Sequence, residues 1–334
     1  MKTESTGPNE TRRTTPARGS APLWLVVASF AAVYTIWGST YLGIRYAVES
    51  IPPFLMAGSR HLMAGIALFT FARLRGAAAP TRTEWRDAAI AGTLMLVIGN
   101  GGVTWAEQRI PSSIAALLVA LTPLWMVLID WLRPGGVRPR TLVGVGLVFG
   151  IAGVALLARG NGEHHEAIYG WSVAALLAAS VGWAFGSMFS RGARKPASPF
   201  LGVSMQMIAG GSVLFGLAAT QGEFGQFSLA RVTALSFGSW LFLVIAGSLV
   251  AYTAYVWLLQ VSTPARVATY AYVNPLIAVL LGCTLGREVF SHALVLAGVL
   301  IIVAVALIVR GGAKPAPKNI QPVNEPSAAL SVPE

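Results

Sequence analysis

The chain has 334 residues, of which 55% are apolar or aromatic and 11% are charged, and its 24 basic and 13 acidic side chains give a net charge of +11. Soluble domains carry roughly a quarter charged residues, so this composition excludes a soluble, disordered or coiled-coil protein. A disulfide scaffold is excluded because Cys283 is the single cysteine. The composition predicts a polytopic membrane protein.

Ten apolar segments follow one another, each close to the roughly 20 residues that an α-helix needs to cross a bilayer. The first five are expected near residues 23–44, 54–74, 88–105, 114–132 and 142–158. The second five are expected near residues 171–190, 200–220, 234–259, 265–285 and 293–309. Short loops leave no room for a soluble domain. Residues 1–22 and 312–334 are predicted to be disordered cytoplasmic tails, because they are rich in Pro, Ser, Thr and Ala.

The basic residues predict the orientation of these spans. With the N-terminus inside, the tails and inner loops hold 18 Lys and Arg residues, whereas the outer loops hold 5. Such an excess is typical of the cytoplasmic side of a membrane. Both chain ends are therefore expected on the cytoplasmic side of a bacterial inner membrane. The bases are spread between the spans and form no single patch, so no nucleic-acid partner is expected.

The two sets of five spans resemble two copies of one unit. A shift of 146 residues places Trp37 on Trp183 and Phe54 on Phe200. A shift of 152 residues matches the later spans, placing Trp105 on Trp257, Gln108 on Gln260 and Pro123 on Pro275. An odd number of spans per copy makes the second copy enter the membrane from the opposite side, which gives an inverted repeat. The alternative is chance matching within an apolar alphabet.

Several runs also resemble a known family. Residues 37–41 (WGSTY), 51–54 (IPPF) and Arg60 are similar to the first two helices of the EamA type within the drug/metabolite transporter superfamily. Residues 105–108 (WAEQ), 111–112 (PS) and 115–123 (AALLVALTP) resemble the third and fourth helices of its bacterial exporter-like members, and Asn274-Pro275 and residues 286–288 (GRE) resemble matching positions in the second half.

The resemblance covers roughly residues 24–311 and implies an all-α fold of ten transmembrane helices in two inverted five-helix repeats, residues 23–160 and 169–311. It also implies export or exchange of small metabolites or toxic compounds. One departure is visible, because Glu288 has no acidic counterpart before Arg140. This departure puts the symmetry of the outer helices in doubt and affects the centre less.

Ionisable side chains at membrane depth are costly, which makes them candidates for function. Arg60 lies about seven residues, or roughly 10 Å, into its helix. It could bind a carboxylate or phosphate of the substrate. Alternatively, it could extend to the outer interface or tie helix ends together through Glu107 or a backbone carbonyl. His61 beside it could take part in proton coupling or simply bond to a neighbour.

Aromatic and amide side chains near mid-span predict a weakly polar pocket, with packing between helices as the alternative. Tyr34, Trp37 and Tyr41 share one helical face. Tyr270 shares a face with Asn274. The residues proposed to bind substrate are Trp37, Tyr41, Arg60, Asn100, Tyr252, Tyr270 and Asn274.

Helix-breaking residues at membrane depth point to the same region. Residues 99–102 (GNGG) interrupt the third span, and Thr122-Pro123 and Asn274-Pro275 are expected to interrupt the fourth and ninth. Paired irregularities in two halves are typical of a transporter binding site, although a static kink is the alternative. The candidates for coupling or gating are His61, Glu107, Pro123 and Pro275.

The sequence contains no recognisable catalytic, nucleotide-binding or metal-binding motif. It therefore predicts a secondary transporter of neutral, zwitterionic or weakly anionic, amino-acid-like metabolites or of drugs, working by alternating access. An enzyme, a cofactor and a metal are not expected. A monomer is expected to suffice, with a homodimer left open, and the partners are a small-molecule substrate and membrane lipid. An intramembrane enzyme or a lipid-handling protein is the alternative.

Overall fold

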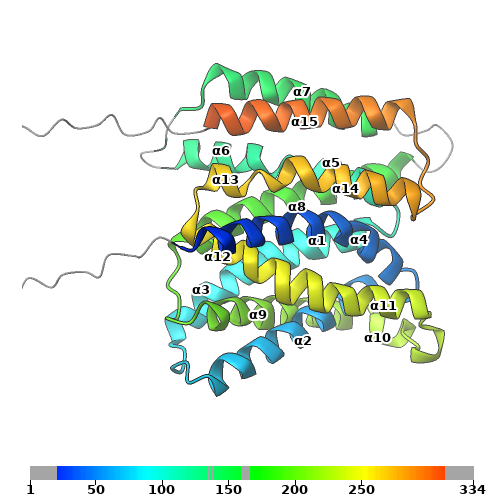
Figure 1. The fold of residues 1–334 in the computed structure, drawn as a ribbon. Coiled ribbons are helices and arrows are strands. Elements are labelled where there is room, and N and C mark those ends of the chain that lie inside the picture. Colours follow the sequence, from blue (N-terminus) through cyan, green and yellow to red (C-terminus); the bar gives the residue numbers. More distant parts are fainter. Residues whose placement is uncertain (1–20, 134–135, 137, 159–165, 313–334) are drawn as a thin grey trace, which may run out of the picture.

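Helices form every regular element of residues 21–133, 136, 138–158 and 166–312, the part of the chain that the computed structural model describes (Figure 1). The helices of the first half are α1 (Leu23–Ala47), α2 (Pro53–Leu74), α3 (Arg82–Gly92), η1 (Thr93–Gly101), α4 (Gly102–Ala106), α5 (Ser112–Val119), α6 (Thr122–Leu132) and α7 (Thr141–Ala158). Those of the second half are α8 (Glu166–Gly192), α9 (Pro199–Thr220), α10 (Glu223–Gln226), η2 (Leu229–Arg231), α11 (Ala234–Phe242), η3 (Leu243–Tyr252), α12 (Thr253–Val261), α13 (Pro264–Val267), α14 (Tyr270–Thr284) and α15 (His292–Gly312). Most of both expected tails lies outside the described residues.

Eight helical stretches in the described residues are long and apolar enough to cross a membrane, and they coincide with eight of the ten expected spans. The fifth and ninth expected spans are shorter apolar helices, Thr141–Leu156 and Tyr270–Thr284. The outside of the bundle is also apolar, since Ile66, Val148 and Val299 are more than half exposed. Such a surface suits lipid rather than water.

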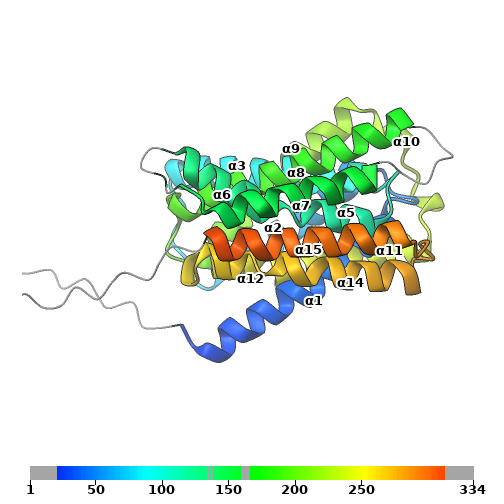
Figure 2. The same ribbon diagram turned by 90° about the horizontal axis from the view of Figure 1, so that it is seen from above.

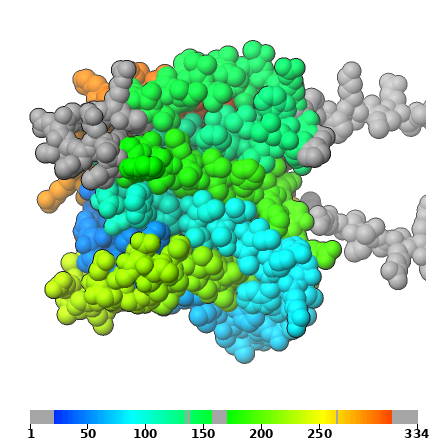
Figure 3. All heavy atoms as spheres, turned by 180° about the vertical axis from the view of Figure 1, so that it is seen from behind, coloured from blue at the N-terminus to red at the C-terminus, as the bar shows by residue number. Residues whose placement is uncertain are grey.

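Corresponding helices of the two halves pack together. The second helices of the halves, α2 and α9, run side by side, as do the fifth helices, α7 and α15, and these two pairs form opposite edges of the bundle in Figure 1. Figure 1 also shows α1 beginning and α15 ending at the same end. Seen from above in Figure 2, the first turns of α1 stand apart from the bundle. From behind, α7 and α8 lie above α3 and α9 (Figure 3).

The contact between α3 and α9 depends on two glycines. A Cβ atom on Gly92 would lie 2.3 Å from the carbonyl oxygen of Gln206, and one on Gly210 would lie 2.8 Å from the carbonyl oxygen of Gly92. Two backbones therefore touch where any side chain would force them apart. This approach fixes η1 of the first half against α9 of the second.

Carboxylates of the second half complete helix ends of the first. Glu223 accepts hydrogen bonds from the backbone N–H groups of Phe54 (3.2 Å) and Leu55 (2.7 Å) at the start of α2. Glu288 accepts from the backbone N–H groups of Ser112 (2.7 Å) and Ser113 (3.1 Å) at the start of α5. An anion at a helix N-terminus satisfies free N–H groups and complements the helix dipole.

Two π-helical segments occupy matching places in the halves. The expected irregularity at residues 99–102 falls at the end of η1, whereas η3, about 150 residues later, was not predicted. The fourth span is interrupted as expected, since α5 ends at Val119 and α6 begins at Thr122.

The expectation for the ninth span was wrong in position. The chain turns at residues 268–269, between α13 and α14, and Pro275 lies inside a continuous α14. Because α14 begins only five residues before Pro275, the proline removes a single backbone hydrogen bond near the start of the helix.

Candidate functional site

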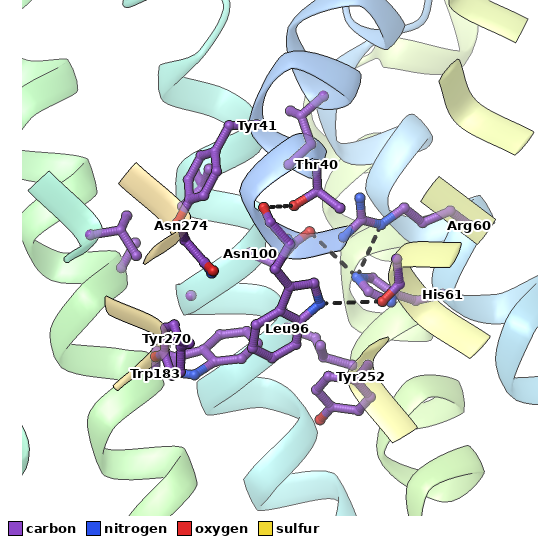
Figure 4. Close-up of a pocket in the computed structure, with 17 residues that line it drawn as sticks. Thr40, Tyr41, Arg60, His61, Leu96, Asn100, Trp183, Tyr252, Tyr270 and Asn274 are labelled. Carbon is purple, nitrogen blue, oxygen red and sulfur yellow. Dashed lines mark hydrogen bonds between the residues drawn. The ribbon is translucent and has the colours of Figure 1, made fainter. Parts of the chain in front are cut away.

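A cavity lies at the centre of the bundle, where α1, α2, η1, α4 and α5 of the first half meet α8, η3 and α14 of the second (Figure 4). Its volume of about 70 Å³ is several times the space that one water molecule needs. The structure brings all seven predicted binding residues into its wall: Trp37, Tyr41, Arg60, Asn100, Tyr252, Tyr270 and Asn274. Among the coupling candidates, His61 also lines it, whereas Glu107, Pro123 and Pro275 lie outside its wall.

Arg60 and His61 form the charged end of the cavity. The Nε of Arg60 donates to the Nε2 of His61 at 3.3 Å, and the Nδ1 of His61 lies 3.4 Å from the hydroxyl of Ser248. The Oδ1 of Asn100 is 3.3 Å from the same Nε2 atom. An imidazole that accepts from arginine on Nε2 carries its proton on Nδ1 and is neutral. Arg60 then holds the positive charge of this end alone.

The Nη1 atom of Arg60 is buried and has no hydrogen-bond partner within the described chain. Arg60 is 4% exposed, so its side chain does not extend to the outer interface. Glu107, at the end of α4, is close enough to act on Arg60 electrostatically, yet both of its buried carboxylate oxygens also lack a partner. Between described residues, the ion pairs within 4 Å are Arg86–Asp87 and Arg133–Asp130. The tie expected of a purely structural Arg60 is therefore absent from the described chain.

Aromatic rings form another part of the wall. Trp37 and Trp183, which the repeat superimposes on one another, meet edge to face with their ring centres 5.3 Å apart. Tyr270 lies edge-on to Trp37 at 5.7 Å, and Tyr255 supports both tryptophans from behind at 4.8 and 5.6 Å. The indole N–H groups of Trp37 and Trp183 are bonded to the carbonyl oxygen of Gly247 and to the hydroxyl of Tyr255. These bonds fix the rings in place.

Sequence reasoning missed Trp183 as a site residue. The signal was present, because the repeat places Trp183 on Trp37, which was predicted to bind substrate. It also missed smaller lining residues, among them Thr40, Ala179 and Gly247. Tyr34, on the predicted face of α1, instead bonds to the hydroxyl of Thr269 at 2.5 Å and does not line the cavity.

One hydrogen bond connects a residue that lines the cavity to a residue that lines a second, smaller pocket. The hydroxyl of Tyr252, which lines the cavity, donates to the Oε1 of Gln206 at 2.7 Å. Gln206 lines the smaller pocket together with Lys195 and the start of α9. Partial burial and the nearby Arg191 lower the pKa of Lys195. The hydrogen bond between Tyr252 and Gln206 thus connects a lining residue of the cavity to a lining residue of the smaller pocket.

Asn274 joins two helices at the edge of the cavity. With its amide nitrogen turned toward the backbone, it donates to the carbonyl oxygens of Tyr34 (3.1 Å) and Tyr270 (3.2 Å), which satisfies the amide. Asn274 therefore holds α1 against α14 in addition to lining the cavity. Within the described residues, no three His, Cys, Asp or Glu side chains gather closely enough to hold a metal ion.

Comparison with known proteins identifies the family. Residues 22–159 and 170–310 each match the EamA-like transporter family. The chain belongs to this family. It is therefore a member of the drug/metabolite transporter superfamily.

Among its EamA-family relatives, the chain is 40% identical over 285 residues to the uncharacterized inner membrane transporter YedA of Escherichia coli K12, covering 84% of this chain and 89% of that protein. It is 26% identical to the uncharacterized transporter YvbV of Bacillus subtilis, covering 89% and 95%. A protein of known crystal structure matches with a TM-score of 0.62 at 22% identity, covering 86% and 96%, and so shares the fold. The names of these relatives indicate a transporter rather than an enzyme.

Proposed function

We propose that the chain is a secondary transporter of the bacterial inner membrane that moves small metabolites or drugs by alternating access through the central cavity. Ten spans in two inverted repeats, residues 23–160 and 169–311, cross the membrane, and both chain ends face the cytoplasm. A monomer contains the whole path. The relatives' names, the apolar outer surface and the matching of two family segments to the two halves support this arrangement.

The observation that carries the proposal is the composition of the cavity wall. Both halves supply helices to this wall, α1, α2, η1, α4 and α5 from the first and α8, η3 and α14 from the second, and both π-helical segments are among them. Irregular helix at membrane depth is tolerated where it lines a cavity, and paired irregularities in two repeats mark the binding sites of transporters. Moving one half against the other would expose the same wall to each side of the membrane in turn.

The wall also narrows the range of substrates. Its described residues include aromatic rings, amides and one arginine, but no Asp or Glu. A cationic substrate would find no carboxylate there, which favours neutral, zwitterionic or weakly anionic, amino-acid-like solutes. Export or exchange is the proposed direction, as the resemblance to exporter-like members of the family implies.

The test is flux across the membrane of liposomes that contain the purified protein, measured for a panel of radiolabelled metabolites with and without a pH gradient. Two tryptophans of α1 provide a matched pair of variants. Trp37 lines the cavity, whereas Trp24 is 71% exposed near the start of the helix. We expect Trp37→Leu to lose flux and Trp24→Leu to keep it.

Equal flux in both variants would contradict the assignment of the cavity. Chemical turnover of a lipid or solute without any flux would favour the alternative, an intramembrane enzyme or lipid-handling protein. Protein yield and elution as a single species, measured for both variants, separate lost transport from lost folding.

A further inference from the structure

The central cavity carries one formal charge among its described lining residues, that of Arg60. A buried cation without a partner is costly, and its cost falls when a ligand brings the opposite charge. Glu107 acts on Arg60 only from outside the wall and makes no ion pair with it. The wall of the cavity therefore carries an excess of one positive charge at the end formed by Arg60 and His61.

The geometry of Arg60 defines what can bind there. Its Nε is already used on His61, whereas Nη1 is buried and unpartnered beside the cavity. The end of the guanidinium fork is thus left for an incoming group. A carboxylate fits the two Nη atoms of such a fork with two parallel hydrogen bonds. A phosphate monoester would bring nearly two negative charges to a single cation.

Away from this end, the cavity offers flat apolar surfaces. Figure 4 shows Trp183 and Tyr270 on the side of the cavity away from Arg60 and His61. The rings of Trp37 and Trp183 meet at 5.3 Å and are held by their own hydrogen bonds, so they do not need to rearrange around a ligand. Rigid aromatic surfaces of this kind favour a planar apolar body.

An ammonium group finds no such place. The α-ammonium of an amino acid lies next to its carboxylate, so binding the carboxylate to Arg60 brings two positive charges close together. The wall contains no Asp or Glu to offset this repulsion. An amide oxygen such as Asn100 Oδ1, which lies 3.3 Å from the Nε2 of His61, carries no net charge and does not replace a carboxylate.

We infer that the substrate is an organic monoanion, with one carboxylate bound by Arg60 and a flat apolar or aromatic body packed on Trp37 and Trp183. This inference rests on the proposed transport function and narrows its substrate class. Within the broader range of neutral, zwitterionic and weakly anionic solutes, it selects carboxylates that lack an amine.

The experiment compares four probes that share one phenyl group and a similar chain but differ in charge: 3-phenylpropionate, L-phenylalanine, 2-phenylethylamine and 3-phenyl-1-propanol. Binding to the purified full-length protein is measured at pH 7 by calorimetry and by quenching of tryptophan fluorescence. We expect the affinity for 3-phenylpropionate to be at least about tenfold higher than that for each of the other probes. A hydrogen bond to a charged group changes the binding free energy by enough to produce such a difference.

Variants locate the effect. In Arg60→Gln, 3-phenylpropionate and 3-phenyl-1-propanol should bind equally, and Arg60→Lys should restore part of the preference. Arg231→Gln makes the same change at an exposed arginine outside the cavity and should keep the full preference. If Arg60→Gln does not yield folded protein, the ranking of the four probes on the unmodified chain decides alone.

The inference is overturned if L-phenylalanine or 2-phenylethylamine binds as tightly as 3-phenylpropionate, if 3-phenylpropionate shows no saturable binding, or if Arg60→Gln keeps the preference. Flux in liposomes separates this inference from the function on which it rests. Flux of L-phenylalanine without binding of 3-phenylpropionate would overturn the substrate class and leave the transporter. Binding of 3-phenylpropionate without flux of any probe would support the class and overturn transport.

Discussion

Replacing Glu288 with alanine should destabilise the protein from a position far from the cavity. The Glu288 carboxylate accepts hydrogen bonds from the backbone N–H and hydroxyl of Ser112, both at 2.7 Å, and from the N–H of Ser113 at 3.1 Å. Both serines are buried, with 0% and 1% exposure. In Glu288→Ala their donors would lose the acceptor without gaining full access to water.

The magnitude follows from these contacts. Loss of an N-terminal cap costs about 0.5–2 kcal/mol, and a hydrogen bond to a charged group contributes about 1.5–3 kcal/mol. Because Glu288 is itself only half-buried and some water can replace it, we expect the free energy of unfolding to fall by about 2–4 kcal/mol. At about 2 °C per kcal/mol for a chain of this size, the melting temperature should fall by roughly 4–8 °C.

The assay is thermal unfolding of the purified variants in one detergent. The measured quantity is the fraction of protein that still elutes as a single species after heating to each temperature. Glu288→Gln keeps one carbonyl oxygen as acceptor and should lose about half as much. Glu49→Ala is the control, because Glu49 is an exposed carboxylate in the loop between α1 and α2. If Glu288→Ala and Glu49→Ala melt at the same temperature, the reasoning about this cap is refuted.

Three further results are expected. Gly92→Ala should abolish the yield of folded protein, because its Cβ would meet the Gln206 carbonyl oxygen at 2.3 Å, whereas Gly216→Ala, with nothing within 4 Å, should express normally; similar yields would contradict the close approach of α3 and α9. Tyr252→Phe should lower the free energy of unfolding by about 1–3 kcal/mol, since it leaves the buried Oε1 of Gln206 without its donor, and unchanged melting would argue against that bond. A reporter enzyme active only outside the cytoplasm should be silent when fused after Lys195 and active after Gly222, and the reverse pattern would exclude the proposed orientation.

Much of the site could be predicted because helical periodicity and the repeat act together. Periodicity places Trp37 and Tyr41 on one face of α1 and Tyr270 and Asn274 on one face of the ninth span, and the paired helix breaks of the two halves pointed to the same region. Neither argument requires atomic detail. Membrane depth marked Arg60 as unusual, since few charged side chains lie within the spans.

The contacts of Arg60 could not be predicted. Whether Arg60 pairs with Glu107 depends on where α2 and α4 place two side-chain ends, and a displacement of an ångström or two decides it. The sequence showed both residues and suggested the pair, but the structure leaves Arg60 Nη1 and both Glu107 oxygens unpartnered. Patterns of residue type do not reach that precision.

The helix irregularities show a second limit. Residues 99–102, at the junction of η1 and α4, contain three glycines, which is a local signal, whereas η3 has Gly247 alone and was not predicted. Pro275 gave a strong local signal for a break, yet the chain turns at residues 268–269 instead. Local propensity therefore located the irregularity at residues 99–102 correctly. It misplaced the break in the ninth span, whose position depends on tertiary packing.

The carboxylate caps on α2 and α5 also determine when, during synthesis, the N-terminal ends of these two helices can form all their hydrogen bonds. The N–H of Leu55 bonds to the carboxylate of Glu223, which is synthesised 168 residues later. The N–H of Ser112 bonds to the carboxylate of Glu288, which is synthesised 176 residues later. At a translation rate of about 5–20 residues per second, each wait lasts roughly 10–35 s. A ribosome that stops before Glu223 leaves both amides without acceptors in a chain already inserted in the membrane, and one that stops between Glu223 and Glu288 leaves that of Ser112 without one. Only a nascent chain that has passed Glu288 can close both helix ends.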